Sequence, residues 1–307
     1  MSEITSADHD RQWTRARPVV VGVDESATAI RAAQWAAVVA DARRAPLWLV
    51  HVVGRHADAS ASEEILADAR RAVLERWTRT SSTPAPTINT FALRGDPATR
   101  LAELSARACE VVVGSAGRRA RGRPMLGSVS ATLVSAAHAP VAVIRPPASG
   151  AAAVGPVLVV TAATDTEAFP LVAAAMRAAA ERRCDVLVVA VTRPGARTSA
   201  VRAEENLEAM LVAHEHHFPT VRARLVTYFG HPRTAIEKFG ATAQLVVTGR
   251  QRKSLWPQLG GITHHALHHT RCAVLVVPER PAKTIASPRS RFGMHNRRRL
   301  PVEQTVS

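Results

Sequence analysis

The feature that most constrains the fold of this chain is an internal repeat. The segment RGDPATRLAELSARACEVVVG at residues 94–114 matches FGHPRTAIEKFGATAQLVVTG at residues 229–249. Further along, LGSVSATLVSAAHAPVAVIRP at residues 126–146 matches LGGITHHALHHTRCAVLVVPE at residues 259–279. Because the matched segments occur in the same order in both halves of the 307 residues, the sequence predicts two copies of one domain in tandem.

Within each half, short apolar runs typical of buried strands alternate with segments of helical periodicity. In the first half we expect strands at 18–24, 47–53, 88–93, 110–113 and 141–144, and helices at 27–45, 62–80, 96–108 and 128–137. In the second half we expect strands at 156–160, 185–191, 221–229, 244–248 and 273–277, and helices at 169–182, 202–217, 230–240 and 262–269. This alternation predicts parallel sheets, and strands that are apolar throughout predict helices on both faces. The predicted fold class is α/β, with two tandem doubly wound domains.

Composition marks the boundaries of these domains. Residues 1–16 are polar and lack the apolar run of a signal peptide, and residues 280–307 mix Pro, Ser and Arg without periodicity, so both ends are expected to be disordered. Residues 147–154 are rich in small residues and are expected to form a flexible linker. The two domains are therefore residues 17–146 and 155–279, called repeat one and repeat two below.

Hydropathy, cysteine usage and charge restrict the environment and the partners. No run of eighteen apolar residues exists, so we expect no membrane partner. The three cysteines, Cys109, Cys184 and Cys272, fit no disulfide framework or zinc pattern, which favours the cytoplasm. The net charge of +15 favours polyanions, but most arginines are spread along the chain, outside residues 118–123 and the C-terminal tail. A solvated basic surface is the preferred interpretation, and nucleic acid is not expected as a partner.

Glycines follow the fourth strand of repeat one in the spacing G-x2-G-x9-G-S. They are Gly114, Gly117 and Gly127, the last followed by Ser128 at the start of a helical pattern. Gly114 and Gly117 would let the backbone approach a ligand and adopt positive φ. At the helix start, free N–H groups and the helix dipole favour a phosphate, and the Ser128 hydroxyl could add a hydrogen bond or help to hold Mg²⁺. On spacing alone, a glycine-rich connection without a ligand fits equally well.

An acidic residue, Asp24, ends the first strand and would face the same edge of the sheet. Ligands of open parallel sheets bind beyond the carboxyl ends of the strands, where a carboxylate can accept hydrogen bonds from a ribose. The alternative is that Asp24 caps the helix that starts near Ala27. Ser26 or Glu25 could provide that cap instead, so we favour a binding role for Asp24.

With these motifs in place, the chain resembles the universal stress protein family in its tandem form. The resemblance covers residues 17–146 and 155–279 and is carried by VVVGVDES, LVHVV, RGDP, VVVGSAG and LGSVSATLVSAAHAPVAVIRP. It implies a flavodoxin-like domain with a five-stranded parallel sheet in each repeat. It also implies a homodimer formed through the fifth strands, at 141–144 and 274–277.

The resemblance further implies an ATP site in repeat one, with Mg²⁺ as the accompanying ion. Gly22 and Asp24 would contact the adenosine, and Val52 would meet the adenine. The phosphates would be held by the residues of the loop and the following helix start: Gly114, Gly117, Gly127, Ser128, Val129 and Ser130.

Repeat two departs from this pattern. Its segment TGRQRKSLWPQLGGIT has no counterpart of Gly117, and Gly261 stands where Ser128 would be. Thr263 matches Ser130, but Asp165 lies about two residues too far along to match Asp24. We therefore expect weak or no ATP binding in repeat two, which would serve as a pairing surface.

The histidines offer a second kind of chemistry. His264 with His268, and His265 with His269, have the i, i+4 spacing that a helical metal site needs, but no Cys or acid lies nearby in the sequence. A polar helix face is the preferred interpretation. His51 lies in an apolar strand and is expected to be a satisfied core histidine rather than a catalytic base.

The function that we expect is a non-catalytic ATP-binding regulator of the stress response, read by a regulatory protein partner. Two alternatives remain open. One is a slow ATPase or adenylate-transferring enzyme, and the arginines at 118–123 are the only sequence feature that supports it. The other is a basic adaptor that binds nucleic acid through its tail.

Overall fold

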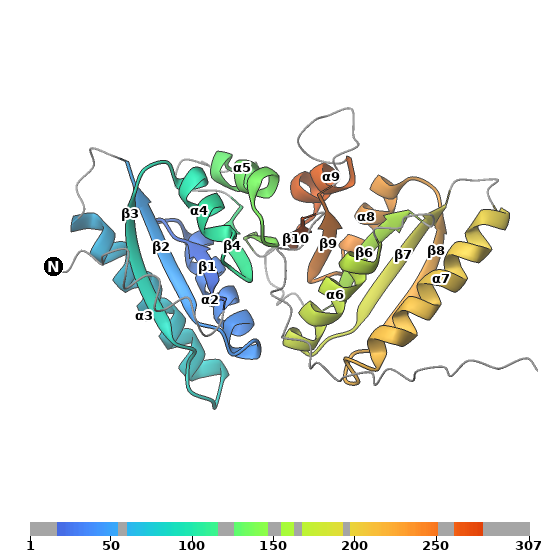
Figure 1. The fold of residues 1–307 in the computed structure, drawn as a ribbon, viewed down its shortest axis with the longest axis horizontal. Coiled ribbons are helices and arrows are strands. Elements are labelled where there is room, and N and C mark those ends of the chain that lie inside the picture. The colour runs from blue at the N-terminus through green and yellow to red at the C-terminus, as the bar shows by residue number, and fades with distance from the viewer. Residues whose placement is uncertain are drawn as a thin grey trace, which may run out of the picture.

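A computed structural model describes residues 17–54, 60–115, 126–146, 155–162, 168–192, 197–250 and 261–278 (Figure 1). Repeat one contains β1 (Val19–Gly22), α2 (Ala27–Ala42), β2 (Leu47–Val53), α3 (Ser60–Thr80), β3 (Ile88–Arg94), α4 (Pro97–Ser105), β4 (Glu110–Gly114), α5 (Ser128–Ala136) and β5 (Val141–Ile144). Repeat two contains β6 (Val157–Ala162), α6 (Ala168–Arg182), β7 (Val186–Thr192), α7 (Arg197–Glu215), β8 (Ala223–Phe229), α8 (Pro232–Gly240), β9 (Leu245–Gly249), α9 (Gly261–His269) and β10 (Ala273–Val277). The order of elements predicted from the sequence is confirmed.

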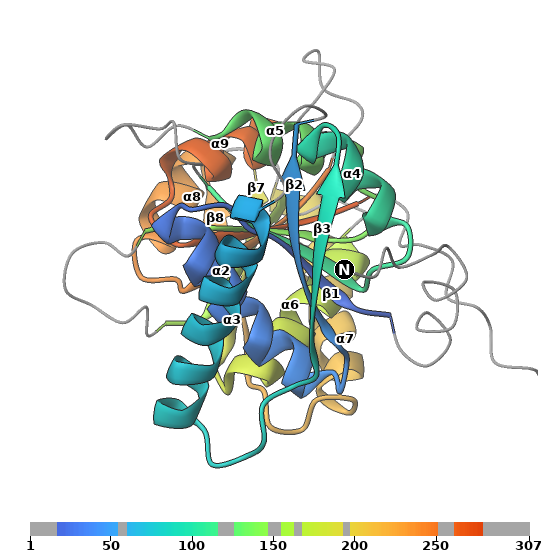
Figure 2. The same cartoon turned by 90° about the vertical axis from the view of Figure 1, so that its left-hand side faces the viewer.

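The strands form one sheet in the order β3-β2-β1-β4-β5-β10-β9-β6-β7-β8. Each repeat contributes five parallel strands, as predicted, and the two halves join where β5 and β10 pair antiparallel. Each repeat places two helices on each face of the sheet: α2, α3, α6 and α7 cover one face, and α4, α5, α8 and α9 cover the other (Figures 1 and 2).

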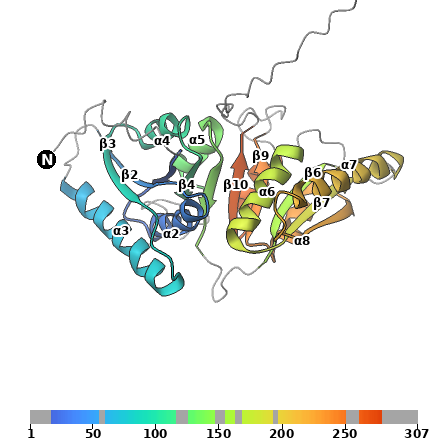
Figure 3. The ribbon, with the colours of Figure 1, turned by 60° about the horizontal axis from the view of Figure 1, so that its bottom comes forward.

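The pairing of β5 with β10 changes the oligomer that we expected. Val143 lies opposite Val274, and β4 and β9 occupy the outer edges of the two strands. The two repeats therefore make within one chain the contact that we expected between two chains (Figure 3). Neither β5 nor β10 has a free edge with which a second chain could pair.

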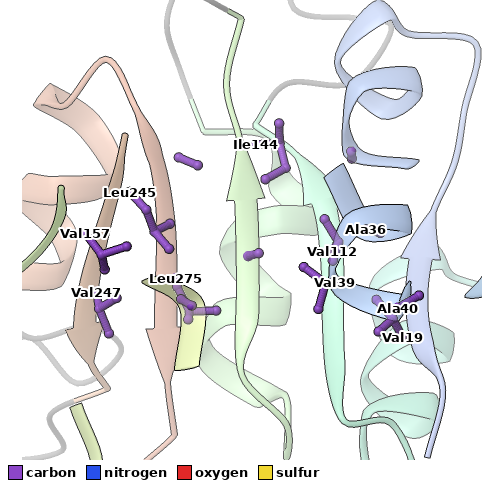
Figure 4. Packing of buried hydrophobic residues seen from close by; sticks show 14 of the residues in the cluster. Val19, Ala36, Val39, Ala40, Val112, Ile144, Val157, Leu245, Val247 and Leu275 are labelled. Carbon is purple, nitrogen blue, oxygen red and sulfur yellow. The ribbon is translucent and has the colours of Figure 1, made fainter. Parts of the chain in front are cut away.

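The core is shared by the two repeats. On one face, Val19 and Ala36 of repeat one belong to the same buried cluster as Val157, Leu245 and Leu275 of repeat two (Figure 4). A second cluster on the other face also contains residues of both repeats. Because both clusters cross the β5–β10 pair, separating the repeats would expose apolar surface on both faces of the sheet.

The helices α2 and α6 end in the same way at equivalent arginines. Arg44 has φ 50° and Arg183 has φ 53°, both in the left-handed region. The next residue then bonds back into the helix, from Ala45 N–H to the Ala40 carbonyl and from Cys184 N–H to the Ala179 carbonyl, which is the Schellman pattern. This cap ends α2 at Ala42, three residues earlier than helical periodicity alone predicts.

A buried charge cluster lies where α2 and α6 meet. Arg43 donates from Nη2 to Glu110 at 2.7 Å and from Nε to Glu181, across the repeat boundary, at 2.6 Å. Arg182, the counterpart of Arg43, pairs with Glu181 at 3.2 Å and lies 3.9 Å from the ring centroid of Trp35 on α2. Burial by itself lowers the pKa of Arg43, but the carboxylates of Glu110 and Glu181 outweigh that effect and raise it overall.

The remaining expectations about the environment concern thiols and membrane spans. All three cysteines are free. None of the helices in the described part of the chain combines the length and apolar character needed to cross a membrane. The expected disordered ends, the linker at 147–154 and the arginines at 118–123 lie outside the described residues.

Candidate functional site

Repeat one has its topological switch point between β1 and β4. The chain leaves β1 into α2 on one face of the sheet and leaves β4 into α5 on the other. Val21 pairs with Val112, so the carboxyl ends of the two strands, at Gly22 and Gly114, lie side by side. In open parallel sheets this is where ligands bind, because the diverging helices leave the strand ends accessible.

The glycines at these strand ends have a packing role that sequence reasoning did not assign. A Cβ on Gly114 would lie 2.6 Å from Thr28 Oγ1, and a Cβ on Gly22 would lie 2.7 Å from Leu101 Cδ1. Among the described glycines only Gly95 has positive φ, so the expectation of positive φ at Gly114 was wrong. Gly22 and Gly114 allow α4 and α2 to approach the sheet closely.

The start of α5 has backbone donors without a side-chain cap. Gly127 is the N-cap, with φ −66° and ψ 153°, and as a glycine it has no side chain to cap the first turn of the helix. The Gly127 N–H itself donates to the Ser115 carbonyl at 2.8 Å, which anchors the helix start beside the end of β4. Ser128 is exposed and Val129 is half-buried. The first-turn N–H groups and the positive end of the dipole thus suit an anion.

Ser130 holds α5 to β4. Its side chain is buried, and its Oγ donates to the Gly114 carbonyl at 2.7 Å. The hydroxyl proton is thereby used inside the protein, so Ser130 contributes to the site by placing the helix start next to the strand end.

Asp24 is positioned by a turn of its own. Its Oδ1 accepts from the Ser26 N–H at 2.9 Å, an Asx-turn, and the residue is half-buried. The cap of α2 is Ser26, whose Oγ accepts from the Ala29 N–H at 3.1 Å. This confirms that Asp24 is not the cap and that its carboxylate follows the end of β1.

The neighbouring end of β2 forms the side of the site. Val52 is half-buried and lies opposite Leu93 in the β2–β3 pair. His51 Nδ1 lies 2.8 Å from the Val23 carbonyl, which confirms the expectation of a satisfied histidine. The site residue Gly117 lies outside the described residues.

Two residues at the switch point were missed from the sequence. Thr28 is buried against Gly114, and its Oγ1 lies 3.1 Å from Ser26 Oγ. Ser115 is buried, donates to the Ile144 carbonyl at 2.7 Å and accepts from Gly127. The only signal for either was its place beside a motif residue, since neither residue type is unusual there.

Repeat two keeps the framework of the site and has an arginine at the position of Ser115. Thr263 Oγ1 donates to the Gly249 carbonyl at 2.6 Å, as Ser130 does to Gly114. The Arg250 N–H donates to the Val277 carbonyl at 2.9 Å, so Arg250 occupies the place of Ser115. The Arg250 guanidinium turns away from its own repeat and reaches α5 of repeat one. Asp165 and residues 251–260 lie outside the described residues.

The histidines of α9 stack in the pairs that their spacing predicts. The ring centroids are 4.3 Å apart in both His264–His268 and His265–His269. His265 is buried, and its Nε2 lies 3.0 Å from Glu237 on α8. Nowhere in the described ranges do three or more His, Cys, Asp or Glu side chains gather as a possible metal site.

One cavity of about 670 Å³ lies elsewhere, at the amino-terminal ends of the repeat-two strands. Arg182, Asp185 and Gln244 contribute to its lining. It lies at the opposite ends of the strands from those that form switch points, so we do not assign it to the candidate site.

Fold and switch point together define a doubly wound α/β protein with two pseudo-equivalent halves. Residues 15–145 and 154–278 both match the model of the universal stress protein family. A universal stress protein of Mycobacterium tuberculosis is 32% identical over 301 residues, covering 84% of this chain and 96% of the relative. The chain belongs to the universal stress protein family.

Two further comparisons concern the sequence and the fold. Another universal stress protein of Mycobacterium tuberculosis is 41% identical over 153 residues, which cover 49% of this chain and 56% of the relative. The crystal structure of a universal stress protein from Archaeoglobus fulgidus covers 86% of this chain and 99% of its own at 15% identity, with a TM-score of 0.66. The structural likeness extends over both repeats.

Proposed function

We propose that this chain is a non-catalytic ATP-binding regulator of the stress response, with one nucleotide site at the switch point of repeat one. The observation that carries the proposal is the start of α5, whose uncapped first turn lies beside the ends of β1 and β4. A cluster of backbone N–H groups at a helix start favours phosphate groups.

The residues at the switch point fit a nucleotide. The first turn of α5, at Gly127, Ser128 and Val129, would receive the phosphates together with Gly117 of the preceding loop. Asp24 would accept from the ribose hydroxyls, and Val52 would lie against the base. Mg²⁺ bound to the phosphates would offset their charge, and the Ser128 hydroxyl, which is exposed, would approach it.

A regulatory role is favoured over catalysis by how the nearby polar groups are used. In the described part of the chain the Ser130 hydroxyl and His51 Nδ1 both bond to backbone carbonyls, and neither is hydrogen-bonded to a nucleophile or base partner there. ATP would act by favouring one conformation that a protein partner recognises. Phosphate release at about 1 per second or faster would instead support the ATPase alternative.

The decisive experiment is calorimetric titration of ATP with Mg²⁺ into the full chain and into Gly117→Val/Gly127→Val. Gly127 has a φ that any residue can adopt, so the expected outcome is a folded variant without ATP binding. Gly261→Val, at the open start of α9 in repeat two, is the control for a glycine-to-valine change outside repeat one and should bind normally. Unchanged affinity in the double variant would refute the site.

Two supporting experiments separate the alternatives. Mass spectrometry of any nucleotide released from the purified protein would identify the ligand. Salt-dependent binding of nucleic acid that disappears on deletion of residues 282–307 would support the adaptor alternative, since phosphate contacts are strongly weakened by salt.

A further inference from the structure

The short helix α5 is hydrogen-bonded at both ends, to repeat one at its start and to repeat two at its end. At its start, Ser130 and Gly127 bond to the end of β4 in repeat one. At its end, Arg250 of repeat two donates from Nη1 to the carbonyls of Ser135 and Ala137, at 2.9 and 2.8 Å.

The contact at the end of α5 uses groups that a helix cannot satisfy by itself. The last carbonyls of a helix lack partners within the helix, and they carry the negative end of its dipole. A guanidinium there makes charge-assisted hydrogen bonds and pairs with the dipole. Arg250 is half-buried, which limits the competition from water.

Arg250 lies at the position in repeat two that is equivalent to Ser115 in repeat one. Its backbone occupies the place that Ser115 has in repeat one, at the start of the loop that should carry phosphate-binding groups. The repeat that lacks the complete glycine spacing therefore supplies a support for α5 of repeat one.

We propose that Arg250 is a positioning residue for the nucleotide site of repeat one, acting through α5. This inference rests on the proposed function. With nine residues, α5 is about 13 Å long, so a shift at one end moves the N–H groups at the other. Repeat two thus takes part in nucleotide binding without binding a nucleotide itself.

The chain contains a matched control in the opposite direction. Arg145, which follows β5 of repeat one, donates from Nη2 to the Leu267 carbonyl on α9 of repeat two. Arg145 and Arg250 both link the repeats through a helix carbonyl, but only Arg250 supports the helix of the proposed site.

The test compares Arg250→Gln, Arg250→Lys and Arg145→Gln in the full chain. We expect Arg250→Gln to weaken ATP binding by about threefold to tenfold, because a charge-assisted hydrogen bond is lost at a distance from the ligand. Arg250→Lys should restore part of the affinity, and Arg145→Gln should retain all of it. Amide hydrogen exchange without nucleotide should accelerate in α5 only in the Arg250 variants.

Each outcome decides a separate point. Equal ATP affinity in Arg250→Gln and the wild type, or an equal loss in Arg145→Gln, would overturn the inference. If the wild-type chain binds no ATP, the proposed function fails and the positioning role fails with it. Unchanged exchange in α5 of Arg250→Gln would refute the mechanism even if the site exists.

Discussion

Ser130 Oγ donates to the Gly114 carbonyl at 2.7 Å and joins the helix that follows the loop to the strand that precedes it. Thr263 and Gly249 repeat this contact at 2.6 Å in repeat two, although the loop between them differs in sequence. A contact kept in both repeats belongs to the framework of the fold, and only repeat one combines it with the complete glycine spacing.

Ser130→Ala should therefore affect stability and binding together. The variant leaves the carbonyl of the half-buried Gly114 without its Ser130 donor, which costs about 1–3 kcal/mol of unfolding free energy, and it frees the start of α5. We expect weaker ATP binding by calorimetry and a lower midpoint in urea. Thr263→Ala should reduce stability similarly but leave ATP binding intact, and Ser130→Thr should behave like the wild type.

The charge cluster between α2 and α6 predicts a large loss of stability on removing its central cation. Arg43→Met removes the salt bridge of the buried Glu110 and leaves Glu181 paired with Arg182 alone, and breaking a buried pair in this way costs about 3–5 kcal/mol. Urea denaturation measures the loss. Arg100→Met, which removes the exposed pair with Glu103, is the control and should cost about 1 kcal/mol or less. Equal losses of unfolding free energy in the two variants would show that the buried cluster stabilises the fold no more than an exposed pair does.

The order of elements could be predicted because apolar runs and helical periodicity are local signals, and the repeat showed each of them twice. The end of α2 could not be predicted, since an arginine with positive φ at Arg44 replaces the glycine that usually marks such a cap. The pairing of β5 with β10 within one chain was also not predicted, because sequence periodicity does not distinguish pairing within a chain from pairing between chains.

The candidate site was predictable in part for the same reason. Glycine spacing and a strand-terminal acid are visible in the sequence, and the structure brings Asp24, Gly114 and Gly127 to one switch point. What Gly114 touches was not visible, because its neighbour Thr28 is far away in the sequence. The hydrogen bond from Arg250 to the Ser135 carbonyl likewise joins residues far apart in the sequence, so it could not be predicted.

Acidification should destabilise the fold through the buried His265 and the half-buried His268. Burial lowers the pKa of His265 and of His268, and the neighbouring His269 and His264, respectively, lower it further. The unfolded chain then binds more protons than the folded chain as the pH falls below about 6.5, so the stability present above that pH is progressively lost. Urea denaturation from pH 7.5 to 5.5 should show the decline.

The variant His265→Gln/His268→Gln should flatten this pH dependence. His216→Gln, at an exposed position after α7, is the matched control for loss of a histidine. An identical decline in the double variant and the wild type would assign the acid sensitivity to other groups.

The last prediction is that the chain binds one nucleotide. Repeat one combines Gly114, Gly117 and Gly127 with the uncapped start of α5. Repeat two has Arg250 at the place of Ser115, and its guanidinium is engaged with α5 rather than available to a phosphate in its own loop. Since the repeats share both core clusters, the full chain is the proper sample, and a separated half would expose apolar surface. Calorimetric titration of ATP should saturate near one nucleotide per chain and fall to none in Gly117→Val/Gly127→Val. Saturation near two would show that repeat two holds a nucleotide despite Arg250, and unchanged binding in the double variant would refute the repeat-one loop as the site.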